Sequence, residues 1–274
     1  MDKKRKDIEI MVDFERKNTY NFADLLNIMK ILRKDCPWDR EQTHDSIKSN
    51  FIEETYEVID AIEERNDEHL KEELGDVLLQ VVFHTEMAEE SDRFNMDDVT
   101  TGICEKLIRR HPHIFSDVKA ENADEVLDNW AKIKKQEKAQ KKQSDVMNGI
   151  AKSLPSPMYA YKIQKAAAKV GFDFETDDDA LSKLKEETDE LSDALKSGNS
   201  EKIMEEGGDV MFACINLLRR HNVDPELSLM SSNKKFISRY LYIEKQAKLR
   251  YNMNIDKLSL KEMDELWNES KQKA

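Results

Sequence analysis

The chain contains few glycines and prolines for its length. It has 274 residues but only 7 glycines and 5 prolines, where average composition would give about 19 and about 14. Because chains turn most readily at these residues, the composition disfavours sandwiches, barrels and doubly wound sheets with a glycine-rich phosphate loop. We therefore predict an all-α fold of long helices joined by a handful of turns.

Other absences narrow the function. The three cysteines, Cys36, Cys104 and Cys214, show no CxxC spacing, which argues against a disulfide framework or a zinc ribbon. The 44 basic and 57 acidic residues give a net charge of −13, which disfavours general binding to nucleic-acid backbones. No apolar run is long enough to span a membrane, and the charged start continues into Asp7 and Glu9 rather than into a signal-peptide core. We expect a cytoplasmic protein without nucleic-acid or membrane partners.

Apolar residues recur at helical spacing almost throughout the chain. The stripes in the first half cover residues 22–32, 47–62, 70–82 and 99–107. We expect Asp67 and Asp97 to be the N-caps of the last two helices, and His111-Pro112 to end the fourth. The first half therefore reads as four amphipathic helices followed by a tail.

The second half repeats this pattern after a break. Residues 132–142 are rich in Lys and Gln, and residues 144–157 contain one glycine and two prolines, so a charged helix running into a linker is expected. Helical periodicity then restarts. We predict an N-terminal tail at 1–20, a first helical unit at 21–142, a linker at 143–157 and a second unit at 158–274.

The two halves also match in sequence. Glu53-Glu54-Thr55-Tyr56-Glu57 corresponds to Glu186-Glu187-Thr188-Asp189-Glu190, and Glu73-Leu74-Gly75-Asp76 to Glu206-Gly207-Gly208-Asp209, both at an offset of 133. Further matches pair Trp38-Asp39 with Phe172-Asp173, Lys106 and Arg110 with Lys235 and Arg239, and Trp130 with Trp267. The chain is therefore interpreted as a tandem duplication of one helical unit.

Each copy carries Glu-Glu-x-x-Glu, then fifteen residues, then Glu-x-x-Asp. Acidic residues are common in this chain, so one copy alone could be a solvated helix face, but a second copy with the same spacer argues against chance. If the two helices of the second copy pack antiparallel across a turn at 197–200, four carboxylates converge at the edge of the core. Such carboxylates repel one another unless a cation lies among them, and all-oxygen ligands select Mg²⁺ or Mn²⁺.

Further motifs accompany the acidic ones. They are Cys36-Pro37-Trp38-Asp39-Arg40-Glu41-Gln42-Thr43-His44, Arg109-Arg110-His111-Pro112-His113-Ile114-Phe115, Lys162-Ile163-Gln164-Lys165, Val170-Gly171-Phe172-Asp173 and Asn233-Lys234-Lys235-Phe236. Together with the acidic motifs they resemble the MazG family of all-α nucleoside triphosphate pyrophosphohydrolases. The tandem arrangement is similar to that of the two-copy members, and the resemblance covers about residues 21–274.

The resemblance implies hydrolysis of nucleoside triphosphates to the monophosphate and pyrophosphate, for nucleotide-pool housekeeping or a stress response. Metal-activated water would attack the α-phosphorus. The implied ligands of Mg²⁺, or of Mn²⁺ as a substitute, are Glu187, Glu190, Glu206 and Asp209 in the second copy and Glu54, Glu57, Glu73 and Asp76 in the first. Glu186 and Glu53, each one residue before a ligand, either orient the water or act as general base, or are exposed charges.

The resemblance also implies a substrate-binding set. Lys235 and Arg239 suit phosphate oxygens, as do Lys106 and Arg110 in the first copy. Trp267 stacks on the base, closes the pocket or anchors the core.

The two copies differ at one further position. His84 stands in the first copy near where Asn216 stands in the second, which indicates that the copies treat substrate differently. We expect the second copy to be the main active site. A homodimer, or pairing of the two copies, is also expected.

Two other functions are weighed against this one. A non-catalytic adaptor could bind a basic partner through its acidic helices. A di-iron bundle would need two Glu-x-x-His segments, and only Glu41 to His44 fits that pattern.

Three of the glycines lie beside the predicted metal ligands. Gly75, Gly207 and Gly208 lie inside the Glu-x-x-Asp segments, where a mid-helix glycine is costly, so a neighbouring helix or a ligand should approach closely there.

Overall fold

The structure is a computed structural model that describes residues 14–116, 122, 125, 126, 129, 130, 133, 137 and 143–272. These residues form helices, turns and loops and no strand, so the all-α prediction is confirmed. The chain divides into two compact units, residues 1–131 and 132–274. Most of the predicted N-terminal tail and of the charged segment at 132–142 lies outside the described residues. No described helix is both long and apolar enough to cross a bilayer.

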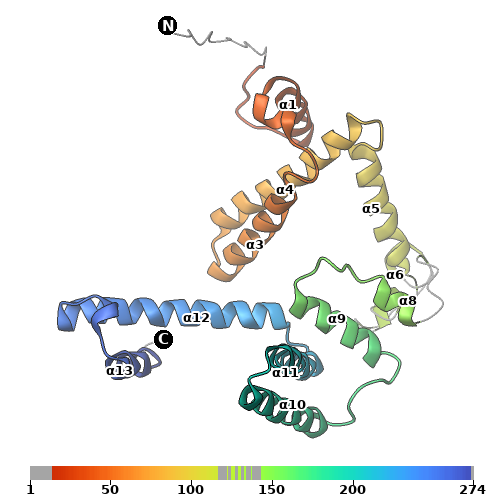
Figure 1. Ribbon diagram of the computed structural model, residues 1–274. Coiled ribbons are helices and arrows are strands. Elements are labelled where there is room, and N and C mark those ends of the chain that lie inside the picture. The colour runs from red at the N-terminus through yellow and green to blue at the C-terminus, as the bar shows by residue number, and fades with distance from the viewer. Residues whose placement is uncertain are drawn as a thin grey trace. The chain divides into compact units, whose positions relative to one another are not determined.

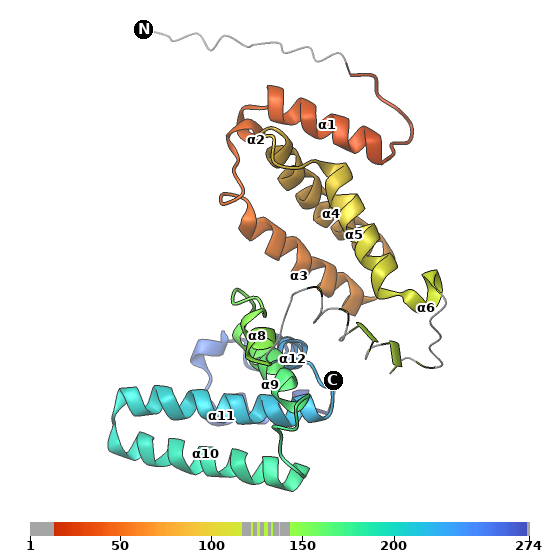
Figure 2. The ribbon, with the colours of Figure 1, turned by 90° about the vertical axis from the view of Figure 1, so that its right-hand side faces the viewer.

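The first unit is built around one helical hairpin. Its helices are α1 (Phe22–Asp35), α2 (Pro37–Glu41), α3 (Lys48–Glu64), α4 (Asp67–Glu89), α5 (Met96–Arg110) and α6 (Pro112–Phe115). Helices α3 and α4 lie side by side in both views (Figure 1 and Figure 2), and α1 packs against α4. The core of the unit consists of Met29, Ile47, Val82, Phe83, Met87 and Met96. Met29 and Val82 belong to the predicted apolar stripes, whereas the α4 core residues Phe83 and Met87 lie beyond the predicted end of the stripe at residue 82.

The N-terminal caps of two helices differ from the prediction. Helices α4 and α5 are capped by Asn66 and Asn95, whose side-chain oxygens accept hydrogen bonds from the third backbone N–H of each helix. The expected caps, Asp67 and Asp97, lie in the first turn instead, where a negative charge is favourable near the positive end of the helix dipole. The expected end of the fourth helix is confirmed, because α5 stops at Arg110.

The second unit contains a second hairpin and a long C-terminal arm. Its elements are α8 (Gln143–Asn148), α9 (Ser156–Ala168), α10 (Asp177–Ser197), α11 (Ser200–Arg220), α12 (Pro225–Gln246), the π-helical turn η1 (Ala247–Tyr251), the 3-10 turn η2 (Ile255–Lys257) and α13 (Leu260–Ser270). Helix α8 occupies part of the segment expected to be a linker. The predicted turn between α10 and α11 is confirmed: Gly198 adopts a left-handed conformation, with φ of 68°, and Asn199 caps α11.

Helices α10 and α11 run antiparallel and adjacent, as Figure 2 shows. Helix α9 packs on α11, where the side-chain amide of Gln164 donates to the carbonyl of Phe212 at 2.9 Å. Helix α13 folds back onto the end of α12, and a small core of Ile243, Ala247, Leu258 and Leu266 holds the two together. Each unit therefore presents one acidic motif on each arm of a helical hairpin.

Candidate metal centres

The hairpin of the second unit brings three of its four predicted metal ligands together. Glu187 and Glu190 on α10 and Glu206 on α11 each present a carboxylate oxygen, and these oxygens lie within 4.8 Å of one another. Glu187 is buried, with 7% of its surface exposed. Asp209 lies three residues beyond Glu206 on α11, is exposed, and is not part of this group.

The first unit assembles the corresponding three side chains. Oxygens of Glu54, Glu57 and Glu73 also lie within 4.8 Å of one another, and Glu73 is buried, with 8% exposure. Asp76 is half-buried and outside this group, but its charge acts on two of the members. Burial raises the pKa of Glu54 and of Glu73, and the neighbouring carboxylates of Glu57 and Asp76 raise both pKa values further. Three acids in this arrangement repel one another without a cation.

The buried glutamate has a different partner in each copy. Glu187 lies 2.7 Å from the Nζ of Lys183, which also lies 2.7 Å from Glu186. In the first unit, Glu73 lies 3.1 Å from the Nε2 of His69, whose Nδ1 lies 3.0 Å from Glu64. The hydrogen bond from Lys183 lowers the pKa of Glu187.

The pKa of Glu190, which lies on the same helix as Glu187, shifts in the opposite direction. The hydrogen bond with Glu187 raises the pKa of Glu190, and burial and the charges of Glu187 and Glu206 add to the rise. Neither Lys183 nor His69 was among the residues predicted from the sequence. Each precedes its glutamate by four residues, a spacing that places two side chains on the same face of a helix, and this signal was available in the sequence.

The donor set fits a hard divalent cation. Both groups found among the described residues consist of glutamates alone, so they offer only oxygen ligands. The Glu-x-x-His ligands of a di-iron centre are not assembled around either group. His44 instead places its Nδ1 2.7 Å from the Nδ1 of His84, with the two rings stacked.

The expected substrate-binding residues of the second unit lie on other helices. Lys235 is exposed on α12, while the Arg239 guanidinium lies 5.4 Å from the ring centre of Trp267 on α13. Phe236 packs on the same indole at 5.3 Å. In the part of the chain that the structure describes, no hydrogen bond or ion pair joins Lys235, Arg239 or Trp267 to the three glutamates, and α12 leads away from α10 and α11 (Figure 1).

The two predicted catalytic glutamates and the predicted phosphate-binding residues of the first unit differ in exposure and contacts. Glu186 is engaged by Lys183, and Glu53, its counterpart in the first unit, is exposed on α3. On α5, Lys106 is exposed and Arg110 is half-buried.

The glycines beside the acidic residues face open space. A Cβ atom added at Gly75, Gly207 or Gly208 would meet no described atom within 4 Å outside its own helix and chain neighbours. The expected approach of a neighbouring helix is therefore wrong for the described chain. The other expectation, approach of a ligand, stays a prediction.

Comparison with known proteins agrees with this arrangement. Residues 42–115 and 175–242 match the MazG nucleotide pyrophosphohydrolase domain, so the match contains both acidic hairpins. The chain is 42% identical to the nucleoside triphosphate pyrophosphohydrolase of Escherichia coli strain K12 over 252 residues. The aligned region covers 90% of this chain and 95% of that protein. This chain belongs to the MazG family.

Another MazG relative and one solved structure are similar to parts of the chain. The nucleoside triphosphate pyrophosphohydrolase/pyrophosphatase MazG of Thermotoga maritima is 41% identical over 252 residues, covering 91% of this chain and 95% of that protein. A crystal structure of a mazG-related protein from Thermotoga maritima covers 41% of this chain and 98% of that chain, with 23% identity and a TM-score of 0.37.

Proposed function

We infer that this MazG chain hydrolyses nucleoside triphosphates to nucleoside monophosphates and pyrophosphate. The inference follows from family membership and from 42% identity to a nucleoside triphosphate pyrophosphohydrolase over 90% of the chain. The single observation that carries it is the pair of carboxylate groups at equivalent positions of the two MazG segments. An acidic adaptor surface would not require the same three oxygens to meet within 4.8 Å in both copies.

We propose Mg²⁺ as the physiological cation, with Mn²⁺ as a substitute. In the second copy Glu187, Glu190 and Glu206 would hold it, and Asp209 on the next turn of α11 is the proposed fourth ligand. Glu54, Glu57, Glu73 and Asp76 have the same roles in the first copy. When bound, the cation would neutralise charge on the phosphate chain.

The neighbouring side chains support the water and the substrate. Glu186 is proposed to orient the attacking water or to accept its proton, and Glu53 is its counterpart. Lys183 keeps the adjacent Glu187 ionised at neutral pH. Arg239 and Lys235 are proposed to bind phosphate oxygens, and Trp267, held against Arg239, to stack on the base. Lys106 and Arg110 are the proposed phosphate-binding residues of the first copy.

We also propose that the protein is a homodimer. On α12, Phe236, Ile237 and Leu241 are each 56–59% exposed, which leaves an apolar stripe on the described helix. A second copy of the chain would cover such a stripe symmetrically. We propose tandem copies at 21–142 and 158–274, and a cytoplasmic location, where nucleoside triphosphates are available and the free thiols of Cys36, Cys104 and Cys214 remain reduced.

The activity is tested with the purified full chain, Mg²⁺ and a panel of ribo-, deoxyribo- and modified nucleoside triphosphates. We expect monophosphate and pyrophosphate in equal amounts, and loss of both when the metal is chelated. Release of orthophosphate with the nucleoside diphosphate would indicate attack at the γ-phosphorus and contradict the proposal. An absence of turnover on every substrate would favour the adaptor function.

A further inference from the structure

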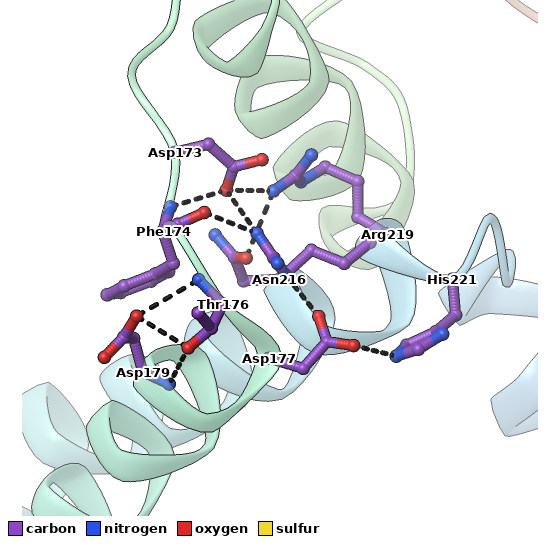
Figure 3. A network of polar contacts seen from close by, with 9 residues as sticks. Asp173, Phe174, Thr176, Asp177, Asp179, Asn216, Arg219 and His221 are labelled. Carbon is purple, nitrogen blue, oxygen red and sulfur yellow. Dashed lines mark hydrogen bonds and ion pairs between the residues drawn. The ribbon is translucent and has the colours of Figure 1, made fainter.

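A basic pocket lies in the second unit, outside the carboxylate group. It has a volume of about 290 Å³ and is lined by Lys165, Asp173, Arg219, Arg220 and Asn222. These residues come from α9, from the loop that leads into α10, from the end of α11 and from the turn that follows α11. Figure 3 shows how Asp173 and Arg219 meet across this junction. The pocket therefore joins three segments that are distant in sequence.

Arg219 is the buried member of the pocket. It is 8% exposed, and its Nη2 donates to Asp173 at 2.5 Å and to the side-chain oxygen of Asn216 at 3.2 Å. Its Nε–H is buried and has no hydrogen-bond partner among the described residues. A buried unpaired donor on a charged group is costly, so a ligand that accepts from it would be stabilising.

The charges around the pocket are not balanced. Asp173 pairs with Arg219. Arg220 donates to Asp177 at 2.6 Å, and its Nη1 lies 3.6 Å from Oδ1 of Asp173. Lys165 has no carboxylate partner in the described part of the chain, and its Nζ lies 5.5 Å from the ring centre of Tyr161. Three cations thus face two carboxylates, in a protein whose overall charge is −13. The local excess is positive where the chain is otherwise acidic.

The duplicated unit shows that the fold does not require a cation at the position of Arg219. At the offset of 133 the positions of Arg219 and Asn222 correspond to Glu86 and Glu89 in the first unit. Glu89 there pairs with Lys30 of α1 at 2.9 Å, so acidic residues at the end of the second hairpin helix are compatible with the same architecture. The arginine at position 219 and the asparagine at position 222 are therefore features of the second copy alone.

We propose that this pocket binds a phosphate-type oxyanion through Lys165, Arg219, Arg220 and Asn222. Guanidinium and ammonium groups together with a side-chain amide are the donors that phosphate oxygens accept from. The oxyanion is either free phosphate or pyrophosphate, or the phosphate group of a nucleotide. The site is separate from the carboxylate group, because Arg219 follows Glu206 by 13 residues on α11, a distance of about 20 Å along the helix.

Binding is measured on the full chain in the presence of EDTA, so that no divalent cation recruits phosphate to the glutamates. Inorganic phosphate, pyrophosphate and adenosine monophosphate are titrated separately by calorimetry and by amide chemical shifts. We expect saturable binding of at least one, with a dissociation constant below about 1 mM and with shifts at Lys165, Arg219 and Asn222. Tighter binding of the monophosphate than of free phosphate would identify a nucleotide as the ligand, and the reverse would identify the inorganic anion.

Two variants test the lining without removing the buried arginine. Lys165→Gln removes one charge, and Asn222→Asp introduces a negative charge at a residue whose φ of 55° aspartate also adopts. Each is expected to weaken binding at least about tenfold. Lys257→Gln is the matched control, because Lys257 is exposed and lies outside the pocket.

Three binding results would each overturn the proposal. These are no saturable binding of any of the three anions, wild-type affinity in both pocket variants, or equal weakening in Lys257→Gln and Lys165→Gln. Chemical shifts confined to the residues around Glu187 and Glu206 would also overturn it. Because no turnover is measured, the outcome is independent of the proposed hydrolysis.

Discussion

At the scale of single residues, the two carboxylate groups differ in the partner of their buried glutamate. Glu187 is held by Lys183, whereas Glu73 is held by His69. The hydrogen bond from Lys183 lowers the pKa of Glu187, whereas burial and the neighbouring carboxylates raise the pKa of Glu73 despite the nearby His69. The buried glutamate of the second copy therefore stays ionised to lower pH than its counterpart, and this supports the proposal that the second copy is the main active site.

Removing one repelling carboxylate should stabilise the metal-free protein. The pKa of Glu190 is raised by Glu187, by burial and by Glu206, so its ionised form at neutral pH costs stability that a neutral side chain does not. We expect Glu190→Gln to melt at a higher temperature than the wild type in EDTA, and to lose the further stabilisation that Mg²⁺ gives the wild type. Thermal unfolding with and without Mg²⁺ measures both effects.

The exposed Asp189 on the same helix provides the control for that experiment. Asp189→Asn removes the same charge outside the carboxylate group and should retain the stabilisation by Mg²⁺. A Glu190→Gln protein that melts below the wild type in EDTA would contradict mutual repulsion within the group.

The Asp173–Arg219 ion pair should make stability depend on pH. Burial raises the pKa of Asp173, but the hydrogen bond and charge of Arg219 outweigh it, and the net pKa is lowered. The pair therefore stabilises the fold above the unfolded pKa of about 3.9 and loses this effect as pH falls through the lower folded pKa. We expect Asp173→Asn to lose about 1–2 kcal/mol at pH 7.

Urea unfolding as a function of pH measures this loss. The difference between Asp173→Asn and wild type should persist down to about pH 4 and shrink below it. A difference that is constant down to pH 2 would indicate lost packing rather than a lost charge pair.

Residue-level prediction from the sequence was most specific where the duplication supplied a second copy of the motif. The repeated spacing identified Glu54, Glu57 and Glu73 together with their counterparts as one group, and the structure brings these three side chains together in each copy. It did not find Asp173–Arg219, because two residues 46 positions apart leave no periodic signal.

At the scale of helices, the open space beside the mid-helix glycines carries a prediction. Gly207→Ala should raise stability by up to about 1 kcal/mol, because alanine is the better helix former and its Cβ meets nothing. Turnover should fall, because the methyl group occupies space beside Glu206 that a bound substrate or ion requires. Thermal unfolding and pyrophosphate release are measured on the same preparation.

Gly102 on α5 is the matched control, since a Cβ there also meets nothing within 4 Å. Gly102→Ala should gain similar stability without losing turnover. If Gly207→Ala is both more stable and fully active, no ligand approaches that turn of α11.

Element boundaries were predictable where two signals coincided. The turn between α10 and α11 combines the end of an apolar stripe with Gly198 and Asn199, and it is placed correctly. The caps at Asn66 and Asn95 were missed because an aspartate follows each asparagine within two positions, and periodicity alone does not distinguish the cap from the first turn.

At the scale of the whole molecule, the proposed dimer depends on the apolar stripe of α12. Leu241→Glu should dissociate the dimer without loss of helicity, because the side chain is 56% exposed within one chain and a charge would be buried at the interface. Light scattering after size exclusion gives the mass. Ser231→Glu, exposed on the same helix but about 80° or more away from the apolar stripe, should remain dimeric.

A Leu241→Glu protein with the same mass as a dimeric wild type would place the interface elsewhere. A wild type that is monomeric at micromolar concentration would contradict the dimer itself.

We propose that the second carboxylate group carries the hydrolysis of nucleoside triphosphates. The most direct test is the rate of pyrophosphate release by Glu187→Gln and Glu54→Gln, matched substitutions in the two copies, with folding checked by circular dichroism. We predict that Glu187→Gln loses about two orders of magnitude or more in kcat, while Glu54→Gln retains at least about half of the wild-type rate. Wild-type pyrophosphate release by a folded Glu187→Gln protein would contradict the claim.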